Sequence, residues 1–253
     1  MNRPVFFQAL NVVAFLVTVA VNGLAGSTTF LNGVTSADIS NMYPTLVTPA
    51  GFTFAIWGII YTLLAVFVIY QLLPRNRDKP FLGQVGMYFG LSNVFNICWL
   101  LLWHYNQIGF SLVLMLALLL SLILIYLRMN IGRAKTSVTE RLCVHLPFSV
   151  YLGWISIATI ANVSVALTAA EWDGFGVAPE TWAVLIICVA VALTLAMLVL
   201  RKDLAFSLVV VWALFGILSK QGGYGDIVLA AQAAIVVVLV AALLIVAVSR
   251  FKR

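Results

Sequence analysis

Eight apolar runs, nearly all long enough to cross a lipid bilayer, dominate this sequence of 253 residues. A membrane-spanning helix needs roughly 17–25 apolar residues. The runs cover about residues 5–26, 51–73, 83–103, 109–127, 143–168, 181–200, 204–219 and 227–248. Hydrophobic residues make up 64% of the chain and charged residues only 9%, against about a quarter in soluble domains. The sequence therefore predicts an all-α fold, a polytopic transmembrane helix bundle of about eight helices.

The basic residues give an independent test of this count. With eight spans and the N-terminus inside, thirteen of the fourteen Lys and Arg residues fall on one side and only Lys220 falls on the other. Dropping one span would scatter them over both sides. Cytoplasmic loops carry an excess of Lys and Arg. The sequence therefore predicts an integral membrane protein with cytoplasmic termini, and this pattern fits a bacterial or archaeal plasma membrane.

Polar residues within the spans divide the chain into two parts. The first five spans carry several Asn and Trp residues, whereas the last three are mostly Val, Ile, Leu and Ala, with Gln232 as their one mid-span amide. Since polar groups at membrane depth are costly and usually face the protein interior, we predict a functional five-helix bundle at 1–170 and a three-helix extension at 171–253. Small residues spaced by four permit close helix contact and make a homodimer an open expectation. Such pairs are Gly86 with Gly90, and Ala230 with Ala234.

Several classes of chemistry lack the residues that they need. No Asp, Glu, Lys or Arg lies well inside any predicted span, which argues against an ion-coupled pump. The two histidines, His104 and His145, fall at opposite sides of the membrane and cannot share a metal, so we expect both to be interfacial anchors. The sequence predicts no catalytic residues and no metal ligands, and this favours a role other than that of an enzyme.

Aromatic and amide side chains recur at helical spacing in the second, third and fifth spans. Intervals of three or four residues place each set on one face of its helix. Three such faces turned to a common cavity would offer aromatic rings and neutral amides without charge, which suits a flat apolar ligand. The same residues would also serve to pack the helices together, and Trp103, Trp172 and Trp182 are typical of interface anchors. The predicted ligand-binding residues are Trp57, Tyr61, Asn93, Asn96, Trp99, Trp154, Ala158 and Asn162.

The most specific of these patterns is the run YLGWISIATIAN from Tyr151 to Asn162. It is similar to the Y-L-x-W-x-x-x-A-x-x-x-N motif of the translocator protein/tryptophan-rich sensory protein (TspO/MBR) family. Weaker similarities to this family follow in the expected order along the chain, over about residues 1–170. They are Tyr43-Pro44 in the first loop, Trp57 with Tyr61 in a W-x-x-x-Y pattern, and Asn96 with Trp99 in an N-x-x-W pattern.

The resemblance implies a five-helix bundle whose cavity opens towards the first loop. Members of the family bind porphyrins, sterols and similar hydrophobic ligands, and are linked to tetrapyrrole sensing, transport or photo-oxidative breakdown. We therefore expect a sensor or passive carrier that binds a porphyrin- or sterol-like ligand; a tetrapyrrole would be a ligand rather than a cofactor. Its partners would be the lipid bilayer and this ligand, and not nucleic acid. A transporter of an uncharged solute and a tetrapyrrole-modifying enzyme stay open as alternatives.

The first loop departs from the family pattern. From Ser27 to Ala50 it contains no Lys or Arg, and Val47 and Thr48 stand where the family has basic residues. The propionates of a porphyrin would find no cation there, which favours a less acidic ligand. The last three helices also exceed the five-helix plan, so the chain resembles a divergent, extended relative.

Overall fold

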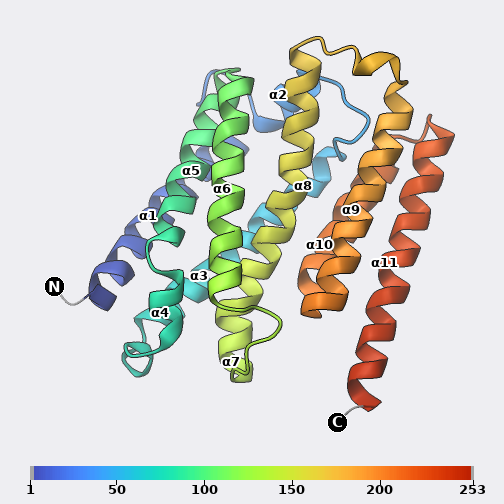
Figure 1. Cartoon of the computed structure of the whole chain (residues 1–253). Coiled ribbons are helices and arrows are strands. Elements are labelled where there is room, and N and C mark those ends of the chain that lie inside the picture. Colours follow the sequence, from blue (N-terminus) through green and yellow to red (C-terminus); the bar gives the residue numbers. More distant parts are fainter. Residues whose placement is uncertain (1–2, 252–253) are drawn as a thin grey trace.

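The computed structural model describes residues 3–251, and it is a bundle of long helices (Figure 1). The elements are α1 (Arg3–Ser27), α2 (Ser36–Met42), η1 (Gly51–Ala55), α3 (Ile56–Leu72), η2 (Pro74–Asn76), α4 (Pro80–Val85), α5 (Tyr88–His104), α6 (Ile108–Arg128), α7 (Val138–Glu140), η3 (Arg141–His145), α8 (Leu146–Ala169), η4 (Gly174–Gly176), α9 (Pro179–Arg201), α10 (Leu204–Lys220) and α11 (Gly225–Phe251). Residues 3–251 contain no strand, so the predicted all-α fold is confirmed.

The long helices alternate in direction through the bundle (Figure 1). Within residues 3–251, six spans are long and apolar enough to cross a membrane, and they include α1, α6, α8, α9 and α11. The sixth joins η1 to α3 over Gly51–Leu72. Two further helices, α5 and α10, have 17 residues each. These eight helices match the eight apolar runs, and the chain is an integral membrane protein.

The third predicted span is not one continuous helix. The predicted helix at 83–103 is interrupted, because α4 ends at Val85 and α5 begins at Tyr88. Gly86 ends α4 with φ +49°, a conformation that side-chain-bearing residues rarely adopt. The prediction that Gly86 and Gly90 form one small-residue pair on a helix face is therefore wrong. Gly90 alone lies within a helix, where it packs against Leu10 of α1.

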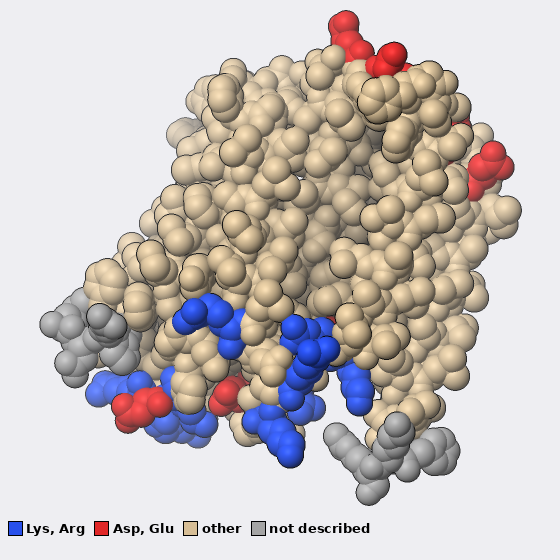
Figure 2. Space-filling model, in the orientation of Figure 1, with Lys and Arg blue, Asp and Glu red and all other residues tan. Residues whose placement is uncertain are grey.

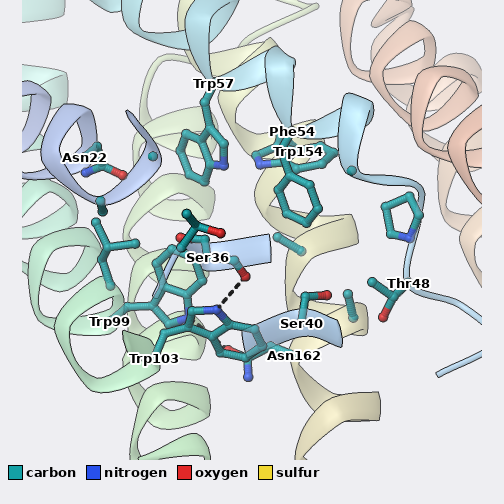
Figure 3. A pocket seen from close by; sticks show the side chains of 18 of the residues that line it. Asn22, Ser36, Ser40, Thr48, Phe54, Trp57, Trp99, Trp103, Trp154 and Asn162 are labelled. Atoms are coloured by element: carbon teal, nitrogen blue, oxygen red, sulfur yellow. Dashed lines mark hydrogen bonds between the residues drawn. The ribbon is translucent and has the colours of Figure 1, made fainter. Parts of the chain in front are cut away.

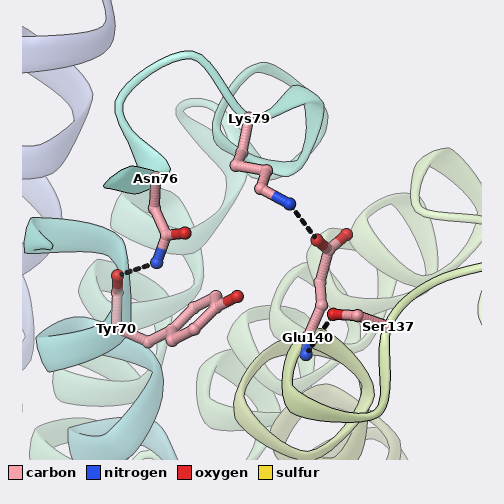
Figure 4. Close-up of polar contacts among 5 residues, drawn as sticks. All are labelled: Tyr70, Asn76, Lys79, Ser137 and Glu140. Carbon is pink, nitrogen blue, oxygen red and sulfur yellow. Dashed lines mark hydrogen bonds and ion pairs between the residues drawn. The ribbon is translucent and has the colours of Figure 1, made fainter. Parts of the chain in front are cut away.

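One end of the bundle is basic (Figure 2). Both termini of the described chain lie at this end, and the opposite end carries acidic side chains (Figures 1 and 2). Lys252 and Arg253, which we predicted on the basic side, lie outside the described residues. Within residues 3–251 the single ion pair joins Lys79 to Glu140 at 3.4 Å, and Ser137 caps the short α7 beside it (Figure 4). A partly exposed pair of this kind stabilises the fold by about 1 kcal/mol at most.

The last three helices pack onto the rest of the bundle mainly through α10, and at the end of α9 Arg201 also donates to Asn130 in the loop after α6. Helix α10 contacts α8, and α11 packs against α9 and α10. Ala234 of the second predicted small-residue pair is buried in α11, together with Ala231. The small residues of this helix thus serve contacts within the chain.

Asp203 is a buried carboxylate whose place inside the bundle was not predicted, because it falls between two apolar runs. It is only 6% exposed. One oxygen accepts hydrogen bonds from Tyr126 of α6, at 2.8 Å, and from Ser149 of α8. The other accepts the Phe206 amide at 3.0 Å and so caps the N-terminus of α10. We call Asp203, Tyr126 and Ser149 the Asp203 cluster; it ties three helices together near the basic end.

Candidate functional site

A cavity of about 420 Å³ lies among α1, α2, η1, α3, α5 and α8 (Figure 3). We call it the Trp57 pocket. It is lined by Asn22, Ala25, Gly26, Thr35, Ser36, Ser40, Thr48, Pro49, Gly51, Phe54, Ala55, Trp57, Tyr61, Trp99, Leu100, Trp103, Trp154, Ile157, Ala158, Ala161, Asn162 and Val165. Four of the five predicted N-terminal spans contribute to this lining. The fourth span, α6, contributes none of the lining residues.

The structure brings most of the predicted ligand-binding residues to this cavity. Six of the eight line it, namely Trp57, Tyr61, Trp99, Trp154, Ala158 and Asn162. Asn93 and Asn96 do not. Asn93 donates to the Phe89 carbonyl of its own helix at 2.8 Å. Asn96 is fully buried, where it donates to Tyr151 Oη at 3.3 Å and accepts from Asn22 Nδ2 at 2.7 Å. Asn93 thus bonds within its own helix, and Asn96 joins α1 to α8 outside the lining. The helical spacing of these residues did not reveal this.

Trp57 is the centre of the aromatic wall. Its ring stacks on Tyr61 at 5.5 Å and on Trp99 at 6.5 Å between centroids. The stack continues from Trp99 to Trp103 at 6.1 Å, so four rings follow one another from α3 to α5, with 17–29° between neighbouring ring planes. Trp154 meets Trp57 edge-on at 6.3 Å. Such a wall presents both ring faces and ring edges, the two geometries by which aromatic groups bind a planar molecule.

Hydrogen bonds behind the rings hold this wall in place. Trp99 Nε1 donates to Asn162 Oδ1 at 2.9 Å, and this bond joins α5 to α8. Asn162 Nδ2 in turn lies 3.4 Å from Ser111 Oγ of α6. Helix α6 thus supports the pocket from outside, although it does not line it. Asn162, which we predicted to bind the ligand, therefore has two roles: it lines the pocket, and its amide holds the Trp99 ring in place.

Two polar atoms of the wall, Trp154 Nε1 and Tyr61 Oη, are buried without a hydrogen-bond partner among residues 3–251. Trp154 is 2% exposed, and its Nε1 makes no hydrogen bond to any residue in the described range 3–251. A buried N–H without an acceptor costs free energy. The Trp154 ring lies beside Phe54 in the pocket wall, with 5.8 Å between ring centroids (Figure 3). The pocket wall therefore holds two hydrogen-bonding groups that no residue in the described range satisfies.

The short helix α2 covers the cavity with Ser36 and Ser40 (Figure 3). Trp103 of α5 donates from Nε1 to the Ser36 carbonyl at 3.3 Å. The helix begins with a capping box in which Thr35 and Asp38 bond one another's backbone amides. These hydrogen bonds from Thr35 to the carboxylate hold the pKa of Asp38 below its ordinary value.

Three residues that we expected to be interface anchors are instead buried. Trp103 is 6% exposed and lines the pocket. His104 is fully buried, with Nδ1 lying 2.9 Å from the Leu100 carbonyl oxygen. His145 is also buried. Their predicted positions near span ends suggested contact with the membrane surface, but packed helices cover them here.

No side chain that lines the pocket carries a charge, and the first loop contributes the uncharged residues Thr48 and Pro49 to the lining. Residues 3–251 contain no group of three His, Cys, Asp or Glu side chains arranged to hold a metal ion. Several lining residues were not predicted, chiefly Asn22, Phe54 and the serines of α2. The T-x-x-D spacing of Thr35 and Asp38 was a signal for α2, since it marks a helix start.

A family model described as TSPO-like protein matches residues 8–247. No curated protein and no solved structure gives a significant match. The family match runs past residue 170 and includes α9, α10 and most of α11, whereas the motifs that first suggested the resemblance lie in residues 43–162. The match covers most of the chain, and the chain belongs to the TSPO-like protein family.

Proposed function

We propose that this protein binds one compact, planar and uncharged hydrophobic molecule in the Trp57 pocket, as a sensor or passive carrier. The observation that carries the proposal is the combination of a cavity with an aromatic wall and no charged lining residue. Ligand sites in proteins are typically about 300–1,000 Å³ and mostly apolar, with a few placed polar groups. A volume of about 420 Å³ is in the lower part of that range and favours a single compact ligand.

The polar groups of the pocket indicate which ligand chemistry suits it. Trp154 Nε1 can donate to a ketone, ester or hydroxyl oxygen. A carboxylate would lose its hydration without gaining a cation, which is unfavourable. This supports a sterol-like molecule or an esterified tetrapyrrole over a free porphyrin diacid.

The charge distribution supports an orientation for this site. Basic side chains gather at the end of the bundle that holds both described termini (Figures 1 and 2). Following the preference of Lys and Arg for cytoplasmic loops, we place this end in the cytoplasm. The first loop and α2 then face the other side of the membrane, and the ligand reaches the pocket from there or from the lipid.

Ligand binding to the purified protein tests this proposal. The ligands are cholesterol, protoporphyrin IX and protoporphyrin IX dimethyl ester, each measured as the amount retained on immobilised protein at equilibrium. We expect saturable one-to-one binding of cholesterol or the ester. The diacid should bind at least about tenfold more weakly than its ester, since each tenfold is about 1.4 kcal/mol and an unpaired buried charge costs more than that.

Two variants separate the pocket from unspecific adsorption. Trp57→Leu removes the ring at the centre of the wall, and should abolish most of the binding. Trp172→Leu removes a ring that contacts Phe175 and Trp182 away from the pocket, and should bind as the unaltered protein does. Tighter binding of the diacid than of the ester, or equal binding by the two variants, would contradict the proposal.

A further inference from the structure

The rim of the Trp57 pocket is built on α10, a helix outside the five-helix plan. The rim is the segment 49–55, of which Pro49, Gly51, Phe54 and Ala55 line the cavity. Trp212 of α10 donates from Nε1 to the Thr53 carbonyl at 3.0 Å. The Ala50 amide donates to the Gly216 carbonyl at 3.0 Å. The backbone of the rim is thus hydrogen-bonded to a helix about 160 residues further along the chain.

Close packing accompanies these two hydrogen bonds. A Cβ atom on Gly216 would overlap Thr53 Cγ2 and would lie 2.9 Å from Pro49 Cβ, so only glycine allows this approach. The Phe52 ring meets Trp212 and Phe215 of α10 edge-on, with centroid distances of 5.5 and 5.9 Å. The rim therefore fits against α10 through both main-chain bonds and ring contacts.

The far end of α10 is fixed as well. There the Asp203 cluster joins the start of α10 to α6 and α8. At the rim end, Gln221 Nε2 donates to the Thr45 carbonyl at 3.2 Å. A helix held at both ends acts as a rigid spacer between the packed interior and the pocket rim. Phe54 of the rim contacts the Trp154 ring, so the position of the rim also affects the position of this ring in the pocket wall.

We propose that Trp212 and Gly216 are positioning residues for the ligand site, through which the three C-terminal helices set its affinity. This rests on the proposed function of the Trp57 pocket. Neither residue lines the cavity, so neither touches the ligand. When the rim is already held in its binding geometry, less free energy is lost in ordering it when a ligand binds. Without α10, the largely irregular segment that precedes η1 would have to order itself around each ligand.

The test uses Trp212→Phe in the full chain, with Trp182→Phe as a matched control. Phe keeps an apolar ring and removes the N–H. Trp182 likewise donates from Nε1 to a backbone carbonyl, that of Gly174, at 3.0 Å, and it belongs to the C-terminal helices without contacting the rim. We expect Trp212→Phe to weaken cholesterol or porphyrin-ester binding by about two- to tenfold, the effect of one lost hydrogen bond. Trp182→Phe should leave the dissociation constant unchanged.

Hydrogen exchange gives a readout that needs no ligand. In Trp212→Phe the amides of Ala50 and Thr53 should exchange faster, whereas amides of α6 and α8 should not change. If Trp57→Leu reduces binding but Trp212→Phe alters neither affinity nor rim exchange, the positioning role is refuted and the pocket stands. If the unaltered protein binds none of the probes, the proposed function fails, while rim exchange still decides the role of α10.

A compensating pair makes the test sharper. Gly216→Ala should displace the rim and weaken binding more than Trp212→Phe does. Adding Thr53→Ser removes the overlapping Cγ2 and keeps the hydroxyl that bonds the Ala50 carbonyl, so the double variant should regain part of the affinity. Equal affinities of the single and double variants, with both folded, would overturn the proposal. Should Gly216→Ala fail to fold, Trp212→Phe decides the question alone.

Discussion

The Trp57 pocket and the Asp203 cluster are both buried polar sites, yet they differ in how their polar groups are satisfied. In the cluster both carboxylate oxygens of Asp203 accept hydrogen bonds, from two hydroxyls and a backbone amide. In the pocket the rings surround about 420 Å³ of space, and Trp154 Nε1 has no partner in residues 3–251. A satisfied cluster stabilises the fold, whereas an open cavity with a free donor is suited to a ligand. Variants at the two sites should therefore separate stability from binding.

Asp203→Ala should give the largest effect, and it should fall on stability. The change leaves the hydroxyls of Tyr126 and Ser149 buried without their acceptor and removes the cap of α10. Because hydrogen bonds to a charged group are worth about 1.5–3 kcal/mol, we expect a loss of about 3 kcal/mol in the free energy of unfolding. Thermal unfolding in detergent measures it. Asp226→Ala, at an exposed position in the first turn of α11, is the control and should change little.

Ala158→Leu should reduce ligand binding and leave the stability of the fold nearly unchanged, the opposite of Asp203→Ala. The larger side chain fills part of the cavity, so binding of cholesterol or the porphyrin ester should fall by at least about tenfold, equivalent to 1.4 kcal/mol. The melting temperature should stay close to that of the unaltered protein, because the side chain enters open space. Ala169→Leu, at the exposed end of α8, serves as the control. If Ala158→Leu lost as much stability as Asp203→Ala, the two sites would not differ in the way proposed.

The residues of the Trp57 pocket were only partly predictable from the sequence. Helical spacing placed Trp57, Trp154 and Ala158 on faces that meet, because side-chain direction follows from position in a helix. Spacing does not tell how far a side chain lies from the cavity. Asn96 shares a helix face with Trp99, yet it bonds to Tyr151 and does not line the pocket. Composition near a span end is ambiguous too: Trp103 was expected at the membrane surface and is buried.

Contacts between distant segments were beyond such patterns. No spacing rule connects Asp203 with Tyr126 and Ser149, since the cluster exists only once α6, α8 and α10 are packed together. The break at Gly86 was equally hidden, because glycine is also common inside membrane helices. The apolar runs predicted the number of helices well, because length and hydrophobicity are local properties.

The smallest effect concerns α2, the cover of the pocket. Hydrogen bonds from Thr35 lower the pKa of Asp38, so its carboxylate supports the helix start above the ordinary pKa of about 4. This support is lost as the pH falls through the lowered pKa. Amides of Ser36–Met42 should then exchange faster at low pH than the intrinsic rate predicts. Asp38→Asn should lack this pH dependence, and an unchanged profile in that variant would assign the effect to another group.

The lengths of α5 and α10 have a consequence for the surrounding bilayer. Seventeen residues at about 1.5 Å each give a helix of roughly 26 Å, shorter than a hydrocarbon core of about 30 Å. Lipid beside these two helices must thin, or polar side chains must reach outward to meet the headgroups. The two short helices each hold one side of the pocket opening: α5 binds α2, and α10 binds the rim. Acyl-chain length is therefore a physical variable that can act on the helices that hold the pocket opening.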